Sequence, residues 1–446
     1  MIRLNGIKIA LVSLGCDKNL VDSEVALGQL AAAGAAFTQN QAEAQVIIIN
    51  TCGFVRDAVD EAREAIERAC TYKRDLCRAV IVTGCYAQRF HKQILEDFPI
   101  DGIAGVGEYD RIAEIVSRAM TSPGGIHMDK QNFDEAIYAK RILSTPAHFA
   151  YVKIAEGCDN HCTYCTIPQI RGKYKSRSFD SLIQEMENLA KNGVREVILI
   201  AQDTALYGLD NYGKPRLHEL LAEIVKISGI KWIRLMYCYP EHISDELISE
   251  MANNPKVVKY LDMPIQHGVD KILRLMGRKS RRSGLLDIIA KLRAAMPDIS
   301  LRTTIIAGFP NEDEADFDQL CDFIRLAKFD RLGVFAYSPE DGTPAAAMDN
   351  QNAEDVKNWR CQQIMEIQAE ISSEKLAKNI GRELDVIVEE YQENCYGRSY
   401  GDAPGIDGVV IIDTDKQLQI GDFIRVRIID SFEHDLVGVL VNESCQ

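Results

Sequence analysis

The chain has 446 residues, more than one ordinary hydrophobic core uses, so about three domains are expected. Apolar residues make up 46% and charged residues 26%, which is typical of soluble globular proteins, and no run approaches the roughly 20 apolar residues of a membrane span. With 51 basic and 66 acidic residues, the net charge is −15. The chain as a whole therefore repels phosphate, although a local basic patch could still bind nucleic acid.

The first apolar run predicts a strand and not a signal peptide. Residues 9–15 (IALVSLG) form a short run that lacks a small-residue cleavage pattern and leads directly into charged residues. Without an export signal, the 13 cysteines are expected in the reducing cytoplasm, where metal or redox use is favoured over disulfides.

The first predicted domain, residues 1–140, alternates β-branched runs with stretches of helical periodicity. We expect Asp22 or Ser23 to cap its first helix. The β–α order predicts a parallel sheet with helices on both faces, an N-terminal α/β sandwich. The predicted strands are 7–14, 44–51 and 79–84, and the predicted helices between them are 21–34 and 55–70.

Each of these strands is followed by a cysteine, and the three cysteines are Cys16, Cys52 and Cys85, the N-terminal trio. The carboxyl ends of parallel strands meet at one edge of a sheet, where open α/β folds place their sites. Small buried cysteines are also common at strand ends, which is the simpler interpretation. The repetition after all three strands favours convergence on a metal site.

The second predicted domain, residues 141–375, continues the β–α alternation. About six β–α units can be counted, fewer than the eight of a full barrel, so a partial, open βα barrel is expected. The apolar runs that predict its strands lie within 150–157, 195–203, 231–240, 260–268, 299–310 and 329–339.

The third predicted domain, residues 376–446, has strand runs separated by Gly and Asp turns and no long helical pattern. A small five-stranded, OB-like all-β barrel is the natural expectation. This segment contains fourteen acidic and six basic residues, so it carries a net charge of −8.

A second trio, Cys158, Cys162 and Cys165, lies within eight residues just after the first strand of the second domain and is called the loop trio. Structural zinc takes four ligands, whereas three thiolates on a 4Fe–4S cube leave one iron open to an outside ligand. The CxxxCxxC spacing therefore predicts a reactive cluster. A zinc knuckle completed by His161 is disfavoured, because His161 and Cys162 are adjacent and cannot easily point at one metal.

This CxxxCxxC loop after the first strand of a partial βα barrel resembles the signature of the radical S-adenosylmethionine (SAM) enzymes. The resemblance implies that the open iron binds the amino and carboxylate groups of SAM and that the reduced cluster cleaves SAM to methionine and a deoxyadenosyl radical. It also implies SAM contacts by Tyr164 near the adenine, by Gly308 in IIAGFP beside the adenine, and by Gln202 in AQDTALYG near the amino group.

The three domains together resemble the methylthiotransferases, in which the C-terminal barrel is a TRAM domain. Residues 13–24 (SLGCDKNLVDSE) resemble the branch that methylthiolates the β-carbon of an aspartate in small-subunit ribosomal protein S-twelve. The tRNA-modifying branch typically has Gln-Met-Asn where this chain has Asp17-Lys18-Asn19. The resemblance implies two 4Fe–4S clusters, the loop-trio cluster making the radical and the N-terminal-trio cluster holding the sulfur, while SAM also donates the methyl group.

The resemblance further implies a reductant protein such as a flavodoxin or ferredoxin, a sulfur donor, and a ribosomal substrate met free or on the ribosome. A tRNA adenosine methylthiotransferase remains an alternative. A non-catalytic electron carrier is disfavoured, because carriers usually give each iron a protein ligand. No catalytic side chain beyond the cofactors' ligands is predicted. His267 is expected to be a satisfied loop residue, with substrate contact as the alternative, and 277–282 (GRKSRR) a solvated helix end or loop that could touch RNA.

Overall fold

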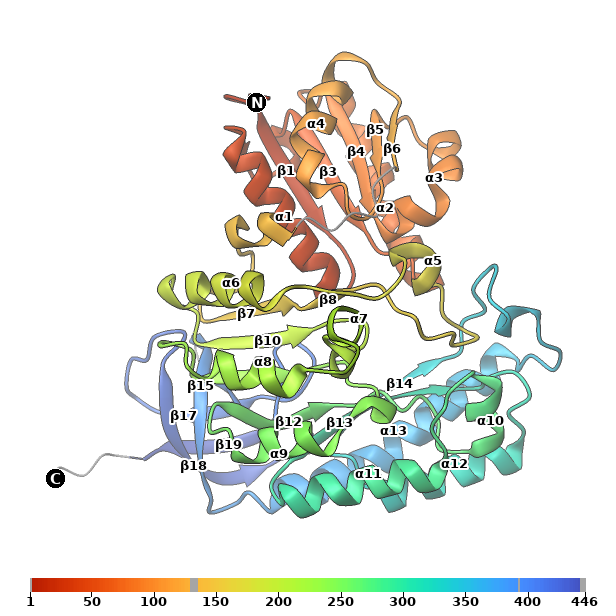
Figure 1. The fold of residues 1–446 in the computed structure, drawn as a ribbon, viewed down its shortest axis with the longest axis vertical. Helices are drawn as coiled ribbons and strands as arrows, with labels where there is room; N and C mark the ends of the chain where they lie inside the picture. The colour runs from red at the N-terminus through yellow and green to blue at the C-terminus, as the bar shows by residue number, and fades with distance from the viewer. Residues whose placement is uncertain (1, 129–134, 392–393, 442–446) are drawn as a thin grey trace.

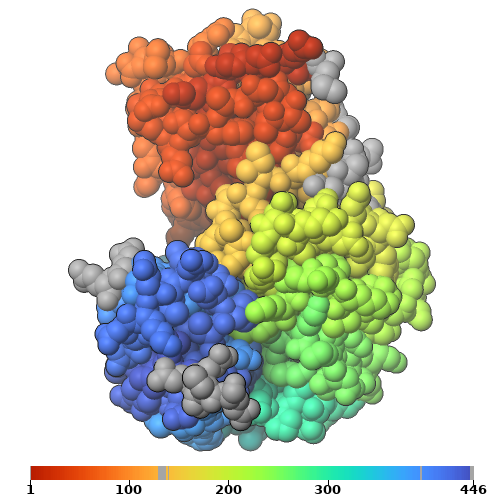
Figure 2. Space-filling model, turned by 90° about the vertical axis from the view of Figure 1, so that its left-hand side faces the viewer, coloured from red at the N-terminus to blue at the C-terminus, as the bar shows by residue number. Residues whose placement is uncertain are grey.

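The computed structural model describes residues 2–128, 135–391 and 394–441, which form three parts, and the N-terminal part lies at one end of the long axis of the molecule (Figure 1). An N-terminal α/β segment rests on a middle α/β segment, and a C-terminal barrel lies beside the middle segment (Figure 2). This arrangement confirms the predicted fold class. No helix within the described ranges is long and apolar enough to cross a membrane.

The N-terminal segment is a six-stranded parallel sheet in the order β2-β1-β3-β4-β5-β6. Its central strands β3 and β4 are buried at every position, because helices cover both faces and every residue of such a strand meets the core. The strands are β1 (Lys8–Ser13), β2 (Ala36–Phe37), β3 (Val46–Thr51), β4 (Ala79–Gly84), β5 (Gly102–Ala104) and β6 (Gly125–His127), and the helices are α1 (Asp17–Ala32), α2 (Arg56–Thr71), α3 (Cys85–Asp97) and α4 (Ile112–Thr121).

Helix α1 begins five residues earlier than its predicted cap. Asp22 and Ser23 lie inside the helix and are buried, and Cys16 occupies the N-cap position without a side-chain capping bond. The prediction was wrong because Lys18 and Asn19, polar residues of the first turn, are also buried and so hide the start of the apolar periodicity. A cysteine of the N-terminal trio therefore lies directly at a helix N-terminus.

The middle segment is an open six-stranded parallel sheet in the order β14-β13-β12-β11-β10-β7, as the partial barrel predicts. A two-stranded ribbon, β8 (Ala155–Glu156) with β9 (Lys175–Ser176), flanks the cysteine loop. The sheet strands are β7 (Phe149–Lys153), β10 (Glu196–Ile200), β11 (Trp232–Leu235), β12 (Val257–Asp262), β13 (Ser300–Ala307) and β14 (Arg331–Ala336). The helices are α5 (Ile167–Arg171), α6 (Phe179–Lys191), α7 (Leu209–Tyr212), α8 (Leu217–Ile224), α9 (Asp245–Asn253), α10 (Asp270–Leu275), α11 (Arg282–Ala295), α12 (Glu314–Ala327) and α13 (Glu354–Ala377).

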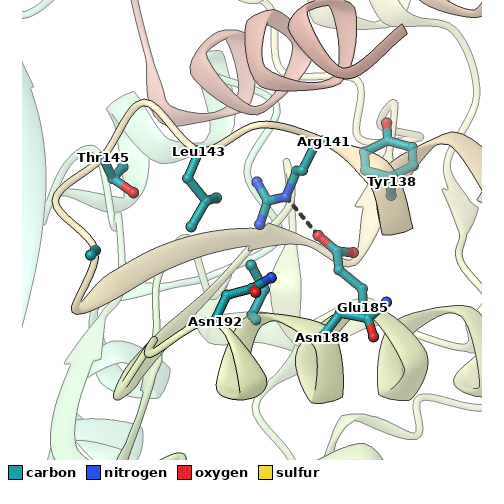
Figure 3. A pocket seen from close by; sticks show the side chains of 9 residues that line it. Tyr138, Arg141, Leu143, Thr145, Glu185, Asn188 and Asn192 are labelled. Carbon is teal, nitrogen blue, oxygen red and sulfur yellow. Dashed lines mark ion pairs between the residues drawn. The ribbon is translucent and has the colours of Figure 1, made fainter. Parts of the chain in front are cut away.

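The connection between the first two segments is anchored by a buried arginine. Arg141 donates from Nη1 to Glu24 of α1 (2.7 Å) and pairs through Nε with Glu185 of α6 (2.9 Å). Figure 3 shows this ion pair among the residues that line a cavity of about 310 Å³ between this connection and α6. One hydrophobic cluster also runs through all three parts and includes Val25, Tyr151 and Ile387. The three segments therefore share part of their hydrophobic core and are not packed independently.

The C-terminal part is a closed five-stranded barrel in the order β15-β16-β17-β19-β18, as predicted. The neighbours β17 and β19 are parallel and the other pairs are antiparallel. The strands are β15 (Glu383–Tyr391), β16 (Cys395–Ser399), β17 (Val410–Asp413), β18 (Phe423–Ser431) and β19 (Leu436–Leu440).

A buried ion triplet fastens the barrel to the middle segment. Glu196 on β10 accepts from Nε of Arg234 on β11 (2.7 Å) and from Nη2 of Arg398 on β16 (2.5 Å). All three side chains are 3% exposed or less. Burial alone raises the pKa of Glu196, but the two guanidinium groups outweigh it and hold the pKa below its ordinary value of 4.5.

We expect Glu196→Ala to lower the free energy of unfolding by ~3–5 kcal/mol, because it leaves the buried guanidinium group of Arg234 without a carboxylate and that of Arg398 with Glu389 alone. Urea denaturation at neutral pH measures the change. The exposed pair formed by Glu383 and Arg427 provides the control, and Glu383→Ala should cost no more than ~1 kcal/mol. Since the pKa of Glu196 is depressed, its contribution is present above pH 4.5 and is lost as the pH falls further. Equal effects of both substitutions would contradict the docking role.

Candidate active site

The N-terminal trio lies along the carboxyl edge of the first sheet. Cys16 precedes α1, Cys52 follows β3 directly, and Cys85 is the first residue of α3. Burial raises the pKa of the Cys85 thiol to about 12 and also raises that of Cys52, and the neighbouring thiols of the trio add to both shifts. Without a metal these two groups are therefore protonated at neutral pH, and binding of iron must release their protons.

Two glycines allow the three cysteines to approach one another. Gly15 has φ +87°, and a Cβ atom there would lie 2.6 Å from Cβ of Cys52. Gly84 has φ +94°, and a Cβ atom there would lie 2.4 Å from the carbonyl oxygen of Thr51. Any other residue at either position would meet both backbone strain and a steric clash. The Gly–Cys pairs of the sequence therefore serve close packing at the strand ends.

The loop trio lies between β8 and α5, where backbone N–H groups point at two of the sulfur atoms. The N–H of Asn160 donates to Sγ of Cys158 (3.4 Å), and the N–H of Ile167 donates to Sγ of Cys165 (3.5 Å). These bonds favour the thiolate, which is the form that binds metal. Burial opposes them and raises the pKa of Cys158 to about 11 and that of Cys165 to about 12.

Each trio has the donor chemistry of a 4Fe–4S site that leaves one iron open. In the part of the chain that the structure describes, no three His, Cys, Asp or Glu side chains are arranged to hold a single metal ion. A cube differs from a single ion, because each thiolate binds a different iron and the ligands stand further apart. Both trios fit such a cube, since each offers three thiols from one strand edge or loop and has donor groups that face sulfur.

Helix α5 joins the two trios. It begins two residues after Cys165 and ends at Arg171, which is buried. The Nη2 atom of Arg171 lies 3.5 Å from Sγ of Cys85 and 3.3 Å from Oδ1 of Asn19, both in the N-terminal segment. The loop that carries one trio is therefore followed by a helix whose last residue, Arg171, contacts the other trio.

The segment after β11 forms a second link. The hydroxyl of Tyr239 lies 3.7 Å from Sγ of Cys162 in the loop trio. Two residues earlier, the hydroxyl of Tyr237 donates to Oδ2 of Asp17 (2.8 Å), next to Cys16. Tyr237 has φ 60°, which is unfavourable for a bulky residue and turns its ring toward the N-terminal segment. The carboxyl edge of the middle sheet thus faces the carboxyl edge of the N-terminal sheet, with the two trios between them.

A buried cluster of ions holds the two segments together beside this space. Asp22 of α1 pairs with Lys153 and with Nη2 of Arg171 (3.0 Å). Glu156 pairs with the same two cations, at 2.5 Å from Lys153 and 2.9 Å from Arg171. A cavity of about 370 Å³ adjoins the cluster and is lined by residues of both segments, among them Tyr109 and Arg171.

The three SAM contacts expected from the sequence have different surroundings. The ring of Tyr164 meets that of Phe309 edge-to-face, with centroids 6.4 Å apart, so it lies beside the strand end that carries Gly308. Gly308 has φ +72°, and a Cβ atom there would lie 2.2 Å from Cγ of Lys357. The side chain of Gln202 is half-buried and has no hydrogen bond to any residue that the structure describes. All three remain predictions.

Two residues that the sequence did not indicate contact the loop trio's surroundings. Asp203, fully buried, accepts from Nδ2 of Asn160 within the cysteine loop (3.3 Å) and lies 2.6 Å from Nδ1 of His242. Asp203 comes directly after Gln202, so the sequence prediction named its neighbour but did not single out this carboxylate. Its position at the end of β10 is the only signal.

The second is Arg278, which is an exception within 277–282, the run that was expected to be solvated. Arg278 is 3% exposed, and its guanidinium carbon lies 4.0 Å from the ring centroid of Tyr239. The run turns inward because Gly277 packs on the cysteine loop, where an added Cβ would lie 2.8 Å from the carbonyl oxygen of His161. Nε and Nη1 of Arg278 have no partner among the described residues, so they could hold a carboxylate such as that of SAM.

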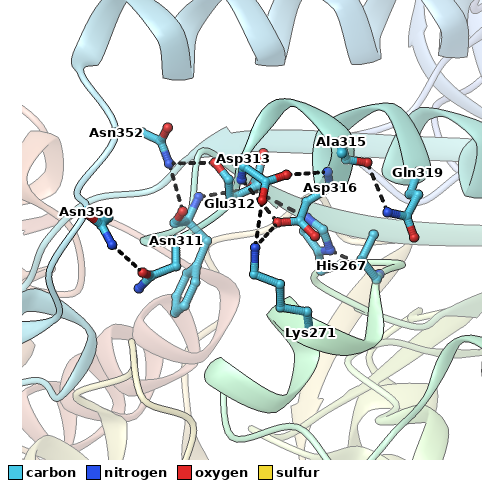
Figure 4. A network of polar contacts seen from close by, with 12 residues as sticks. His267, Lys271, Asn311, Glu312, Asp313, Ala315, Asp316, Gln319, Asn350 and Asn352 are labelled. Atoms are coloured by element: carbon cyan, nitrogen blue, oxygen red, sulfur yellow. Dashed lines mark hydrogen bonds and ion pairs between the residues drawn. The ribbon is translucent and has the colours of Figure 1, made fainter.

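His267 is buried within the middle segment, as the simpler expectation has it. Its Nδ1 accepts from the N–H of Val269 (3.1 Å), and its Nε2 lies 3.5 Å from Glu312. Figure 4 shows this contact behind the capping box of α12, in which Asp313 and Asp316 each accept from the other's N–H. These contacts give His267 a packing and structural role.

Family models match three stretches of the chain. The "Radical SAM superfamily" model matches residues 152–324, the "Uncharacterized protein family UPF0004" model matches residues 8–105, and the "TRAM domain" model matches residues 380–441.

Curated relatives are similar over nearly the whole chain. "Ribosomal protein uS12 methylthiotransferase RimO" of Clostridium botulinum (strain Langeland) is 48% identical over 440 residues, which are 98% of this chain and 99% of the relative. The protein of the same description from Acetivibrio thermocellus is 46% identical over 452 residues, with the same coverage. The one from Desulforamulus reducens is 48% identical over 442 residues, 97% of this chain and 99% of the relative.

Solved structures share the fold at low identity. The radical S-adenosylmethionine methyltransferase TsrM from Kitasatospora setae has a TM-score of 0.57 and 16% identity over 77% of this chain and 74% of its own. The cobalamin-dependent S-adenosylmethionine radical enzyme OxsB has a TM-score of 0.51 and 12% identity over 81% of this chain and 56% of its own.

The fold and the family matches together define a radical SAM enzyme, a transferase of sulfur-containing groups. The identity along almost its full length shows more: the chain belongs to the methylthiotransferase family of radical SAM enzymes, in the group of the RimO proteins.

Proposed function

We propose that the chain inserts a methylthio group at the β-carbon of an aspartate in small-subunit ribosomal protein uS12, the S-twelve protein. The observation that carries this proposal is the identity of 46–48% with relatives described as uS12 methylthiotransferases. The Asp17-Lys18-Asn19 sequence after Cys16 supports the same branch. A ribosomal substrate would place the enzyme in the cytoplasm, with a reductant protein and a sulfur donor as further partners.

The proposal includes SAM and two 4Fe–4S clusters, one on each trio, and a division of the chain at residues 140 and 375. When bound, these groups would supply the hydrogen-atom abstraction, the sulfur and the methyl group. The chain's own contribution is positional. Arg171, Tyr237 and Tyr239 hold the two trios in one space, and Asp203 fixes the cysteine loop.

The surface of the C-terminal barrel supports a basic protein substrate over tRNA. Its segment has six basic residues, and five of them pair with carboxylates. One of these five, Arg398, is also buried. The sixth basic residue, Lys416, forms no ion pair with a residue that the structure describes. A phosphate backbone needs unpaired Lys and Arg side chains, and these are not gathered here. The acidic excess of the segment instead suits a basic ribosomal protein.

We expect the full-length protein to bind uS12 with an affinity that falls as salt rises, and to retain tRNA only weakly at physiological salt. Equilibrium binding over a salt series measures both partners. Mass spectrometry of uS12 from cells with and without the protein then tests the reaction, through a methylthio increment on an aspartate. A protein that binds and modifies tRNA and ignores uS12 would restore the tRNA-modifying alternative.

A further inference from the structure

Lys18 is buried in an unusual place for a lysine. It lies in the first turn of α1, two residues after Cys16, and is 5% exposed. Its Nζ atom lies over the ring of Tyr237, 2.8 Å from the ring centroid. Since Tyr237 lies on the segment that contacts both trios, the ammonium group is held beside the link between them.

The ammonium group of Lys18 has no carboxylate partner among the residues that the structure describes. Its neighbours Asp17 and Asp262 have other partners, because Asp17 accepts from the hydroxyl of Tyr237 and Asp262 accepts from Arg302 (2.9 Å) and from the N–H of Tyr237 (3.0 Å). Buried cations nearby are paired, as Lys153 is with Asp22 and Glu156. A buried cation that lacks an anion is costly, unless a partner from outside the chain supplies one.

An aspartate substrate would supply this partner. The carbon that is to receive sulfur must lie within reach of both trios, and the carboxylate of an aspartate side chain is one bond away from that carbon. A cation held at the same space can therefore fix the carbon by binding the carboxylate through a charge-assisted hydrogen bond. The ring of Tyr237 and the body of α1 keep the ammonium group in place before the substrate arrives.

We propose that Nζ of Lys18 binds the side-chain carboxylate of the substrate aspartate, and that this contact selects aspartate over uncharged residues of the same shape. The inference rests on the proposed function, since it takes uS12 as the substrate. The alternative role for the same lysine is to offset negative charge on the thiolates of the N-terminal trio. The two roles differ in their effect on substrate choice.

The test is a double-mutant cycle between Lys18 and the substrate carboxylate. Reconstituted full-length protein and its Lys18→Met variant are titrated with uS12 and with uS12 whose modified aspartate is replaced by asparagine, in the absence of reductant. Wild type should bind the aspartate form about tenfold to a hundredfold more tightly than the asparagine form, as expected for a hydrogen bond to a charged group. Lys18→Met should bind both forms alike.

Controls separate recognition from structure. Iron content and SAM cleavage of Lys18→Met should match wild type, and Lys18→Arg, which keeps the charge, should retain part of the preference for aspartate. Lys279→Met removes an exposed lysine near the loop trio and should change nothing. If Lys18→Met loses its clusters, the Lys18→Arg and Lys18→Gln variants carry the same comparison.

Three outcomes would overturn the inference. A Lys18→Met protein that keeps both the preference for aspartate and the wild-type affinity leaves charge offset as the role of Lys18. Equal weakening toward both uS12 forms assigns a purely structural role. If the wild-type protein neither binds nor modifies uS12, the proposed function fails together with this inference. The wild-type measurement alone distinguishes this outcome from the other two.

Discussion

Replacing Cys158, Cys162 and Cys165 with alanine should halve the iron of the reconstituted protein and abolish SAM cleavage. Replacing Cys16, Cys52 and Cys85 should also halve the iron, but SAM cleavage should persist while sulfur insertion stops. The physical reason is that the two trios lie on different segments. Cys16, Cys52 and Cys85 all belong to the N-terminal segment, and the loop trio belongs to the middle segment, so each trio supplies all three thiols of its own site. Iron analysis, the Mössbauer spectrum and deoxyadenosine release measure these effects under anaerobic conditions.

Because the two trios are linked, this experiment needs a control for structural damage to the second site. Arg171 and Tyr239 contact cysteines of different trios, so loss of one cluster could disturb the other through a shift of α5. Circular dichroism and the melting temperature of each triple variant should therefore be compared with wild type. A folded triple variant that has lost all its iron would contradict two independent sites.

Most of the fold follows from local patterns in the sequence. Strands β3 and β4 begin with apolar runs, which suit a sheet covered on both faces, and their alternation with helices predicts parallel topology. Parallel topology then puts the ends of β1, β3 and β4 at one edge, so the position of the N-terminal trio needs no further information. The short strands β5 and β6 escape prediction, because three residues carry no measurable periodicity.

The charged part of the site could not be predicted in the same way. Lys18, Arg171 and Arg278 are 6% exposed or less, although charged residues in a sequence normally indicate solvent. Each is buried against groups from distant parts of the chain: Lys18 against Tyr237, Arg171 against Cys85, and Arg278 against Tyr239. No periodicity within a single segment signals such contacts. The start of α1 was misplaced for the same reason.

Arg171→Gln should damage both the stability of the protein and its N-terminal site. It removes one of the two cations that Asp22 and Glu156 share, so two buried carboxylates remain with Lys153 alone. We expect a loss of ~3–5 kcal/mol in the free energy of unfolding, because breaking a buried pair leaves an uncompensated charge. Urea denaturation of the protein before cluster reconstitution measures this loss without interference from bound iron.

The same substitution should weaken the N-terminal site more than the loop site, because Arg171 donates to Sγ of Cys85 but to no cysteine of its own loop. After reconstitution, the iron lost should therefore be that of the N-terminal trio, and SAM cleavage should fall less than methylthio transfer. Arg171→Lys keeps the charge but not the several donors of the guanidinium, so it should recover stability in part. Arg118→Gln, which breaks an exposed pair with Glu114, is the matched control and should cost no more than ~1 kcal/mol. If Arg171→Gln were as mild as Arg118→Gln, the ion cluster would not be what holds the two segments, and their shared apolar core would have to do so alone.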